Sequence, residues 1–176
     1  MKKQNILEEI SALITEDEII MFQELQIKIK ELNNKTNLTR LIDGDDYWIS
    51  QVFDSIWPFK TFQNINFDNK KFLDIGSGCG FPGLAYAITH PTSEIYLVDS
   101  SKKKTDALKS IIKEINFKSN IHVINARVEN LAHQSSMRNS FDIATTRAVS
   151  NPSTVSEYIL PMLKKEGLGV LYCGKW

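Results

Sequence analysis

The chain has 176 residues, of which 42 % are hydrophobic and 24 % charged, with 21 basic and 21 acidic side chains. This size and composition indicate one globular domain with a single core, and the zero net charge argues against a protein that coats nucleic acid indiscriminately. No apolar stretch approaches the roughly 20 residues of a membrane span, and the N-terminus lacks the apolar region of a secretory signal, so we expect a cytoplasmic protein.

The first third of the chain has helical patterns only. Residues Thr15–Glu18 form a capping-box pattern, and apolar residues at helical spacing follow, which predicts a helix over 16–33. A second acidic start at 43–46 predicts another helix, which we expect Pro58 to stop. With a weaker helix near residues 4–14, these segments predict an N-terminal helical cap over residues 1–66.

From residue 67 onward the pattern changes to a β-α-β series. Short apolar runs of strand length alternate with stretches long enough for helices. The expected strands are KFLDI (71–75), EIYLVD (94–99), IHVIN (121–125), FDIAT (141–145) and GVLYC (169–173). The expected helices span about 82–90, 102–116 and 152–165, with a short turn near 128–133. Right-handed crossovers then predict an α/β core over 67–176, with a mostly parallel sheet and a crevice at the carboxyl ends of its strands.

The loop DIGSGCGFPG, after the first strand, fits two kinds of nucleotide site. Its glycines match the dinucleotide fingerprint GxGxxG from Gly78, and they match equally an S-adenosylmethionine (AdoMet) loop that begins at Asp74. A pyrophosphate needs free N–H groups at a helix start and is repelled by carboxylates, whereas Pro82 removes one donor and Asp74 adds a negative charge. AdoMet carries a sulfonium and an ammonium, which suit Asp74.

Two acidic residues follow later strands. Asp99 ends the second strand, where a carboxylate can accept hydrogen bonds from both ribose hydroxyls or, alternatively, cap the next helix. Glu129 can border an adenine or can be a solvated surface acid. The two cysteines, Cys79 and Cys173, lack metal-ligand spacing, so we expect neither a disulfide nor a metal site and interpret both as small buried residues.

The chain resembles the RsmG (GidB) family of bacterial 16S ribosomal RNA guanine-N7 methyltransferases from about residue 19 to its end. The segments that carry the resemblance are KTNLTRL (35–41), FDS (53–55), LDIGSGCGFPG (73–83), LVDSSKKK (97–104), NARVENL (125–131) and TTRAVSNP (145–152). The resemblance implies a Rossmann-like class I AdoMet methyltransferase fold with strand order 3-2-1-4-5 and terminal strands missing. It also implies AdoMet as cofactor and a guanine of 16S rRNA, within the small ribosomal subunit, as substrate.

The resemblance also assigns residues to roles. The implied cofactor-binding residues are Asp74, Gly76, Ser77, Gly78, Gly80, Phe81, Asp99, Ala126, Arg127, Val128, Glu129 and Arg147. The implied RNA-binding residues are Asn37, Arg40, Arg127 and Arg147, and Arg147 and Lys175 are the implied catalytic residues. No metal site is implied, and we expect a monomer.

The residues agree with this chemistry. Guanine N7 presents a lone pair and carries no proton, so the reaction needs placement rather than a general base. Arg147, after the fourth strand, can donate to guanine O6 or to a phosphate, or it can form a surface ion pair with Asp142 or Glu129. We interpret Lys102–Lys104 as solvated residues at the start of a helix rather than as residues that contact RNA.

Three features depart from the family pattern. Gln51 stands where the family usually has His, which leaves a proton-transfer role there without support, and Trp176 stands where a small residue is usual. The family also continues beyond its fifth strand, so strand 168–173 is expected to be an exposed apolar edge. The alternatives are therefore a non-catalytic AdoMet- or RNA-binding remnant and an NAD-linked oxidoreductase, although no hydride-relay motif is visible.

Overall fold

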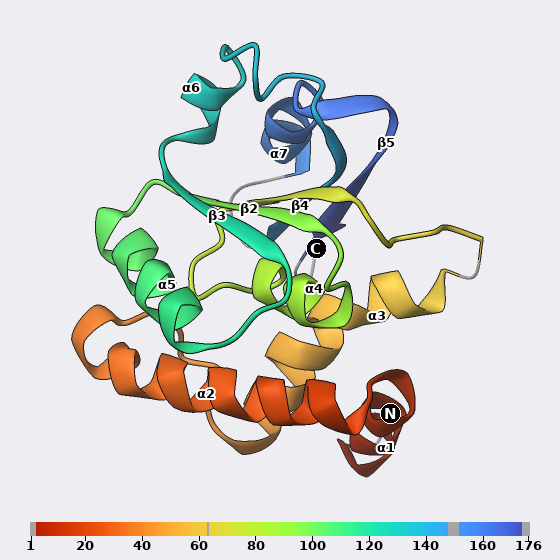
Figure 1. The fold of residues 1–176 in the computed structure, drawn as a ribbon, viewed down its shortest axis with the longest axis vertical. Coiled ribbons are helices and arrows are strands. Elements are labelled where there is room, and N and C mark those ends of the chain that lie inside the picture. Colours follow the sequence, from red (N-terminus) through yellow and green to blue (C-terminus); the bar gives the residue numbers. More distant parts are fainter. Residues whose placement is uncertain (1–2, 63, 148–151, 174–176) are drawn as a thin grey trace.

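In a computed structural model that describes residues 3–62, 64–147 and 152–173, the chain forms a five-stranded sheet in the order β3-β2-β1-β4-β5 (Figure 1). All four neighbouring pairs are parallel, and the predicted α/β class and strand order are confirmed. The strands are β1 (Lys71–Ile75), β2 (Glu94–Asp99), β3 (Asn120–Asn125), β4 (Phe141–Arg147) and β5 (Leu163–Tyr172).

Helices cover both faces of this sheet. On one face α4 (Gly83–Thr89) and α5 (Lys102–Glu114) lie between the sheet and the N-terminal helices, and on the other face lie α6 (Val128–Leu131) and α7 (Pro152–Ile159) (Figure 1). The N-terminal helices are α1 (Lys3–Leu13), α2 (Glu16–Thr36), the π-helical segment η1 (Asp46–Phe53) and α3 (Asp54–Thr61).

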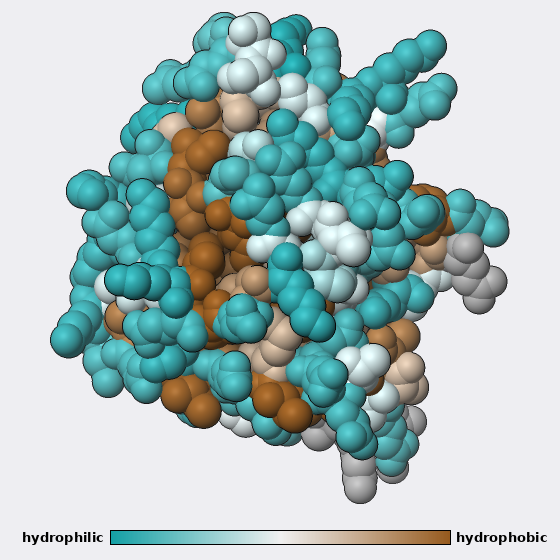
Figure 2. Space-filling model, viewed as in Figure 1, coloured by the Kyte–Doolittle hydropathy of each residue, from teal (hydrophilic) through white to brown (hydrophobic). Residues whose placement is uncertain are grey.

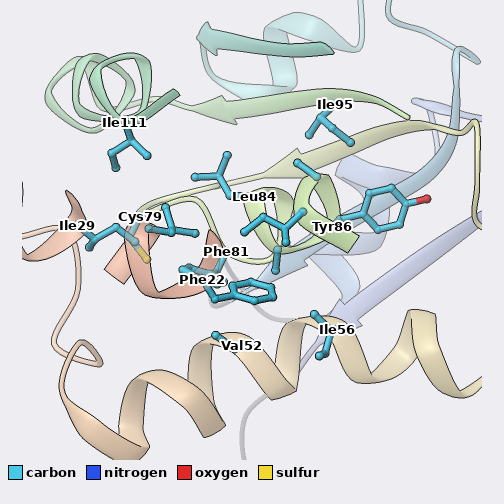
Figure 3. Close-up of a cluster of buried hydrophobic side chains, with 14 of the residues drawn as sticks. Phe22, Ile29, Val52, Ile56, Cys79, Phe81, Leu84, Tyr86, Ile95 and Ile111 are labelled. Atoms are coloured by element: carbon cyan, nitrogen blue, oxygen red, sulfur yellow. The ribbon is translucent and has the colours of Figure 1, made fainter. Parts of the chain in front are cut away.

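The N-terminal helices share a hydrophobic core with the α/β part. Figure 3 shows Phe22 and Ile29 of α2 and Val52 of η1 in one cluster with Leu84 of α4 and Ile111 of α5. These side chains are fully buried, and burial of each large apolar side chain contributes about 1.5–3 kcal/mol. The cap is therefore packed onto the core, and the boundary at residue 66 stays a prediction.

Helix α2 begins at the predicted capping box. The Thr15 hydroxyl accepts a hydrogen bond from the Glu18 amide (3.3 Å), and the Glu18 carboxylate accepts one from the Thr15 amide (2.7 Å). The helix continues past the predicted end to Thr36, and Asn37 follows it in a left-handed conformation. Asn37 begins the loop that leads toward the cleft described below.

Other predicted boundaries are wrong. Pro58 does not stop the second cap helix but lies inside α3, although it cannot donate a backbone hydrogen bond. The neighbouring Phe59 packs edge-on against Tyr86, with 5.0 Å between the ring centroids. This packing offsets the loss of the hydrogen bond. The helix expected to reach residue 165 ends at Ile159, because Pro161 disfavours helical geometry at Leu160. Strand β5 consequently begins at Leu163 rather than near 168.

Both edge strands of the sheet are partly open. Among the strands that the structure describes, β5 pairs with β4 alone, as expected for an edge, and its last residues are half-buried. At the other edge, a groove of about 550 Å³ between α5 and β3 is lined by Ile112, Ile121 and Val123, and Figure 2 shows an apolar strip in this region. Across the described ranges, no helix is long and apolar enough to cross a membrane.

Candidate functional site

Two clefts meet at the carboxyl ends of the strands, where β1 lies between β2 and β4. We name them the Asp99 cleft, of about 420 Å³, and the cap cleft, of about 840 Å³. The Asp99 cleft lies beside the ends of β1 and β2, whereas the cap cleft lies between the glycine loop and the N-terminal helices. Gly76, Lys104 and Arg147 line both, so the two clefts adjoin one another at these three residues.

The loop between β1 and α4 depends on glycine for both conformation and space. Gly76, Gly78 and Gly80 have φ values of 73°, 57° and 103°, which L side chains rarely adopt. A Cβ on Gly80 would also lie 2.4 Å from Cδ1 of Leu84. Ser77 adds a hydrogen bond from its hydroxyl to the Asp74 carbonyl (2.9 Å), which holds the turn against the end of β1.

Asp99 joins the glycine loop to the start of α5. One carboxylate oxygen accepts a hydrogen bond from the Gly78 amide (2.9 Å) and the other accepts one from the Ser101 amide (2.8 Å). The N-cap of α5 is Ser101, so Asp99 is not the capping residue. Asp99 lines the cleft named after it, and each carboxylate oxygen has a further lone pair with which to accept a hydrogen bond.

Asp74 lies at the end of β1 as predicted, but its side chain does not face either cleft, in contrast to the cofactor-binding role that the resemblance implies. Its side chain is fully buried, lines neither cleft, and accepts hydrogen bonds from the Gly83 amide and the Thr145 hydroxyl, both at 3.1 Å. Burial raises the pKa of this carboxyl to about 6, although its hydrogen bonds oppose the rise. The geometry therefore gives Asp74 the role of fixing the loop and α4, and it does not support a direct partnership with a cation in the cleft.

Arg147 is held by neutral acceptors. Its guanidinium donates to the Ser50 carbonyl (2.8 Å) and to the side-chain oxygen of Gln51. The alternative ion pairs are not found among the described residues, and Asp142 pairs instead with Lys164 (2.8 Å). Arg147 thus brings a positive charge to the wall that the two clefts share.

The other predicted site residues divide into four groups. Ala126, Arg127, Val128 and Glu129 line the Asp99 cleft, whereas Ser77, Gly78 and Phe81 line the cap cleft. Asn37 and Arg40 are exposed on the loop after α2 and line neither cleft. Lys175 and Trp176 lie outside the described residues. Of the cysteines, Cys79 is buried as predicted, but Cys173 is exposed, because it follows the end of β5.

Several residues of the cap cleft were not predicted as site residues. They are Thr39, Asp54, Trp57, Lys104 and Tyr172. Burial raises the pKa of the Asp54 carboxyl, while the charge of Arg147 opposes the rise. Asp54 lies in the FDS segment and Lys104 in the SSKKK segment, so a motif signal existed for both, whereas Trp57 and Tyr172 enter the cleft only through the fold. Within the described ranges, no group of three His, Cys, Asp or Glu side chains could hold a metal ion.

Comparisons with known proteins agree with this geometry. The family model of rRNA small subunit methyltransferase G (GidB) matches residues 18–176. Ribosomal RNA small subunit methyltransferase G of Prochlorococcus marinus strain MIT 9312 is 89 % identical over 176 residues, which are 100 % of this chain and 74 % of that protein. The chain belongs to the rRNA small subunit methyltransferase G family. A more distant member, from Prochlorococcus marinus strain NATL1A, is 45 % identical over 92 % of this chain and 65 % of its own length.

Solved structures support the fold expected of this methyltransferase G family. Coclaurine N-methyltransferase, bound to N-methylheliamine and SAH, matches with a TM-score of 0.57 over 96 % of this chain and 58 % of its own, at 17 % identity. A SAM-dependent methyltransferase from Geobacter sulfurreducens, in complex with S-adenosyl-L-homocysteine, has a TM-score of 0.56 over 82 % and 54 %, at 13 % identity. These likenesses show the class I methyltransferase fold.

Proposed function

We propose that this chain transfers a methyl group from AdoMet to N7 of a guanine in 16S rRNA, within the small ribosomal subunit. The observation that carries the proposal is the meeting of the two clefts at Gly76 and Arg147. One cleft offers a carboxylate at the end of β2, and the other offers a cation and exposed aromatic surface. A donor and an acceptor base can thus approach one another at the ends of β1 and β4.

The Asp99 cleft fits AdoMet. Asp99 would hold the ribose hydroxyls, while Ile75, Val98 and Val128 supply apolar surface for the adenine. When bound, AdoMet supplies a methyl group on a positively charged sulfur. Glu129 and Arg127 lie at the exposed rim of this cleft, where they can contact the polar edge of the ligand or the RNA.

A dinucleotide fits the same loop less well. The Gly83 amide, at the start of α4, already donates to Asp74, and the Leu84 amide donates to the Gly80 carbonyl (2.6 Å). Pro82 has no N–H to offer. A pyrophosphate at this helix start would therefore find the Gly83 and Leu84 amides already used and no donor on Pro82, and it would approach the buried carboxylate of Asp74, which disfavours the NAD-linked alternative.

The cap cleft fits a guanine base, which has to be positioned but does not have to lose a proton. Guanine N7 has an in-plane lone pair, and Arg147 can hold the base through O6 or hold an adjoining phosphate without blocking N7. Trp57, 46 % exposed at the cleft, offers a ring on which an unpaired base can stack. No side chain has to remove a proton, so the proposal requires no general base.

The chain's charges suit a folded RNA surface rather than a long duplex. Arg127 is exposed at the Asp99 cleft and Arg40 is exposed on the loop after α2, while the net charge of the chain is zero. N7 is out of side-chain reach in the deep major groove of paired RNA, so the target is an unpaired or exposed guanine. We propose that the chain acts as a cytoplasmic monomer without a metal ion.

The test has two steps. Equilibrium dialysis with labelled AdoMet, competed separately by S-adenosylhomocysteine and by NAD, should give saturable binding that only S-adenosylhomocysteine displaces. Incubation with small ribosomal subunits lacking the methyl group should then place label on N7 of a 16S guanine. Displacement by NAD would favour the oxidoreductase, and cofactor binding without labelled rRNA would favour the non-catalytic remnant.

A further inference from the structure

Gln51 is buried at the point where four segments of the chain meet. Its side-chain nitrogen donates to the Thr39 hydroxyl (2.9 Å) and to the Cys79 sulfur (3.6 Å), and its oxygen accepts from Arg147. It is only 1 % exposed. The loop after α2, the segment η1, the glycine loop and the end of β4 are therefore joined by one amide.

These contacts fix which way the amide points. The nitrogen has two acceptors on one side, and the guanidinium of Arg147, which has donors only, lies on the other. A flipped amide would set its N–H donors against those of Arg147, which has no acceptor to offer. The Gln51 oxygen is thus held toward the guanidinium before any substrate arrives.

The π-helical geometry of η1 supplies a second acceptor next to the first. The Asp54 amide, which in an α-helix would donate to the Ser50 carbonyl four residues earlier, donates instead to the carbonyls of Ile49 and Val52. The Ser50 carbonyl accepts from Arg147 at 2.8 Å. Val52 of the same segment packs in one cluster with Cys79 and Phe81 of the glycine loop, so η1 is seated against that loop (Figure 3).

We propose that Ser50 and Gln51 form a two-point clamp that orients the Arg147 guanidinium in the cap cleft, with Gln51 as a positioning residue for methyl transfer. This inference rests on the proposed function of the cleft. Because both acceptors are neutral, the clamp fixes the direction of the guanidinium while leaving its charge available to guanine O6 or to a phosphate. A carboxylate at position 51 would fix the same group but neutralise it.

The kinetic test uses the whole chain and small ribosomal subunits as substrate. Gln51→Met keeps the length of the side chain and removes both polar atoms, and Gln23→Met makes the same change at an exposed position of α2. Misplacement of a substrate-holding group costs up to about 100-fold in rate, so we expect Gln51→Met to lower kcat/KM about tenfold or more, while Gln23→Met has no effect. AdoMet affinity, measured by dialysis, should change less than twofold in both variants (~0.4 kcal/mol).

A double-mutant cycle separates positioning from general damage to the fold. If Gln51 acts through Arg147, adding Gln51→Met to Arg147→Ala lowers kcat/KM no further than Arg147→Ala alone. Thr39→Val should lower kcat/KM by freeing the amide, and Thr39→Ser should restore most of it. The proposal would be overturned if the losses in kcat/KM of the two single variants multiply in the double variant. It would also be overturned if the Gln51→Met protein is as active as wild type.

A second readout does not depend on methyl transfer. In ¹⁵N-labelled protein, the clamp should slow rotation of the Arg147 guanidinium, giving resolved side-chain signals that Arg147→Lys removes and thereby assigns. Gln51→Met should merge these signals, and Gln23→Met should not. Equal rotation in wild type and Gln51→Met would refute the clamp, whereas slow rotation in a wild-type protein that never labels rRNA would support the clamp and refute the proposed function.

Discussion

Asp74 is a buried carboxylate whose burial costs stability at neutral pH. Its pKa rises from the ordinary 3.8 to about 6, which corresponds to about 3 kcal/mol. Since the folded protein holds this proton more tightly than the unfolded chain, stability is fully present below pH 3.8 and is lost as pH rises through about 6. We therefore expect Asp74→Asn, which never ionises, to be more stable than wild type at about pH 8 by about 3 kcal/mol.

The carboxamide can keep both hydrogen bonds of the carboxylate. Its oxygen can accept from the Gly83 amide, and its nitrogen can donate to the Thr145 hydroxyl, which can in turn donate to the Leu73 carbonyl (3.3 Å away). The substitution is nearly isosteric, so the packing of α4 on β1 is unchanged. The part of the stability difference that varies with pH thus comes from the charge alone.

Urea unfolding of both proteins at a series of pH values measures this effect. The difference between variant and wild type should fall from about 3 kcal/mol near pH 8 to about 1 kcal/mol near pH 4.5, since the contributions of other titrating groups cancel in the difference. A difference that does not vary with pH would refute the reasoning. A loss of AdoMet affinity larger than that of Asp99→Asn would restore Asp74 as a cofactor-binding residue.

Four further predictions concern single residues. Gly83→Ala, whose Cβ would lie 2.2 Å from Cδ2 of Leu97, should lower the free energy of unfolding by about 1–3 kcal/mol in urea titrations. Asp99→Asn should weaken AdoMet binding in dialysis about tenfold, because a charge-assisted hydrogen bond contributes about 1.5–3 kcal/mol. Burial lowers the pKa of His90 to about 4, so wild type should lose about 2 kcal/mol between pH 8 and pH 5 that a His90→Phe variant does not lose. Trp57→Ala should raise KM for the small subunit about tenfold with AdoMet affinity unchanged, since stacking contributes about 1–3 kcal/mol per base.

Each of these expectations has an outcome that contradicts it. An unchanged urea midpoint in Gly83→Ala would mean that the loop relaxes around the methyl group, and full AdoMet affinity in Asp99→Asn would remove the ribose assignment. Parallel pH profiles of wild type and His90→Phe would show that the imidazole titrates normally. A Trp57→Ala protein with unchanged KM would show that the base binds elsewhere in the cap cleft.

Much of the fold follows from local signals in the sequence. The capping box at Thr15 predicted the start of α2, and the change from helical to strand period marked the beginning of the α/β core. The boundary at Pro58 failed because tertiary packing of Phe59 outweighs the local preference of proline. The helix end predicted near residue 165 was wrong for a different reason. Pro161 disfavours helical geometry at the residue before it, and this local signal was not included in the prediction.

The candidate site was less predictable than the fold. Asp99 ends β2 and the segment Ala126–Glu129 follows β3 directly, so their position at the strand ends could be inferred from the order of elements. The burial of Asp74 could not, because it depends on Gly83 and Thr145, the latter 71 residues away in the chain. Motif matching also gave no reason to connect Gln51 with Arg147.

The sequence by itself determined the order of helices and strands, the glycine loop and the carboxylate that ends β2, because these depend on neighbouring residues and on strand order. Only the tertiary structure decided what surrounds Arg147. Its contacts with Ser50 and Gln51 join residues 97 and 96 positions apart, and the π-helical register that presents those two acceptors has no signature in the residues of η1. Such contacts form only when the N-terminal helices pack against the glycine loop, which requires the whole core to fold.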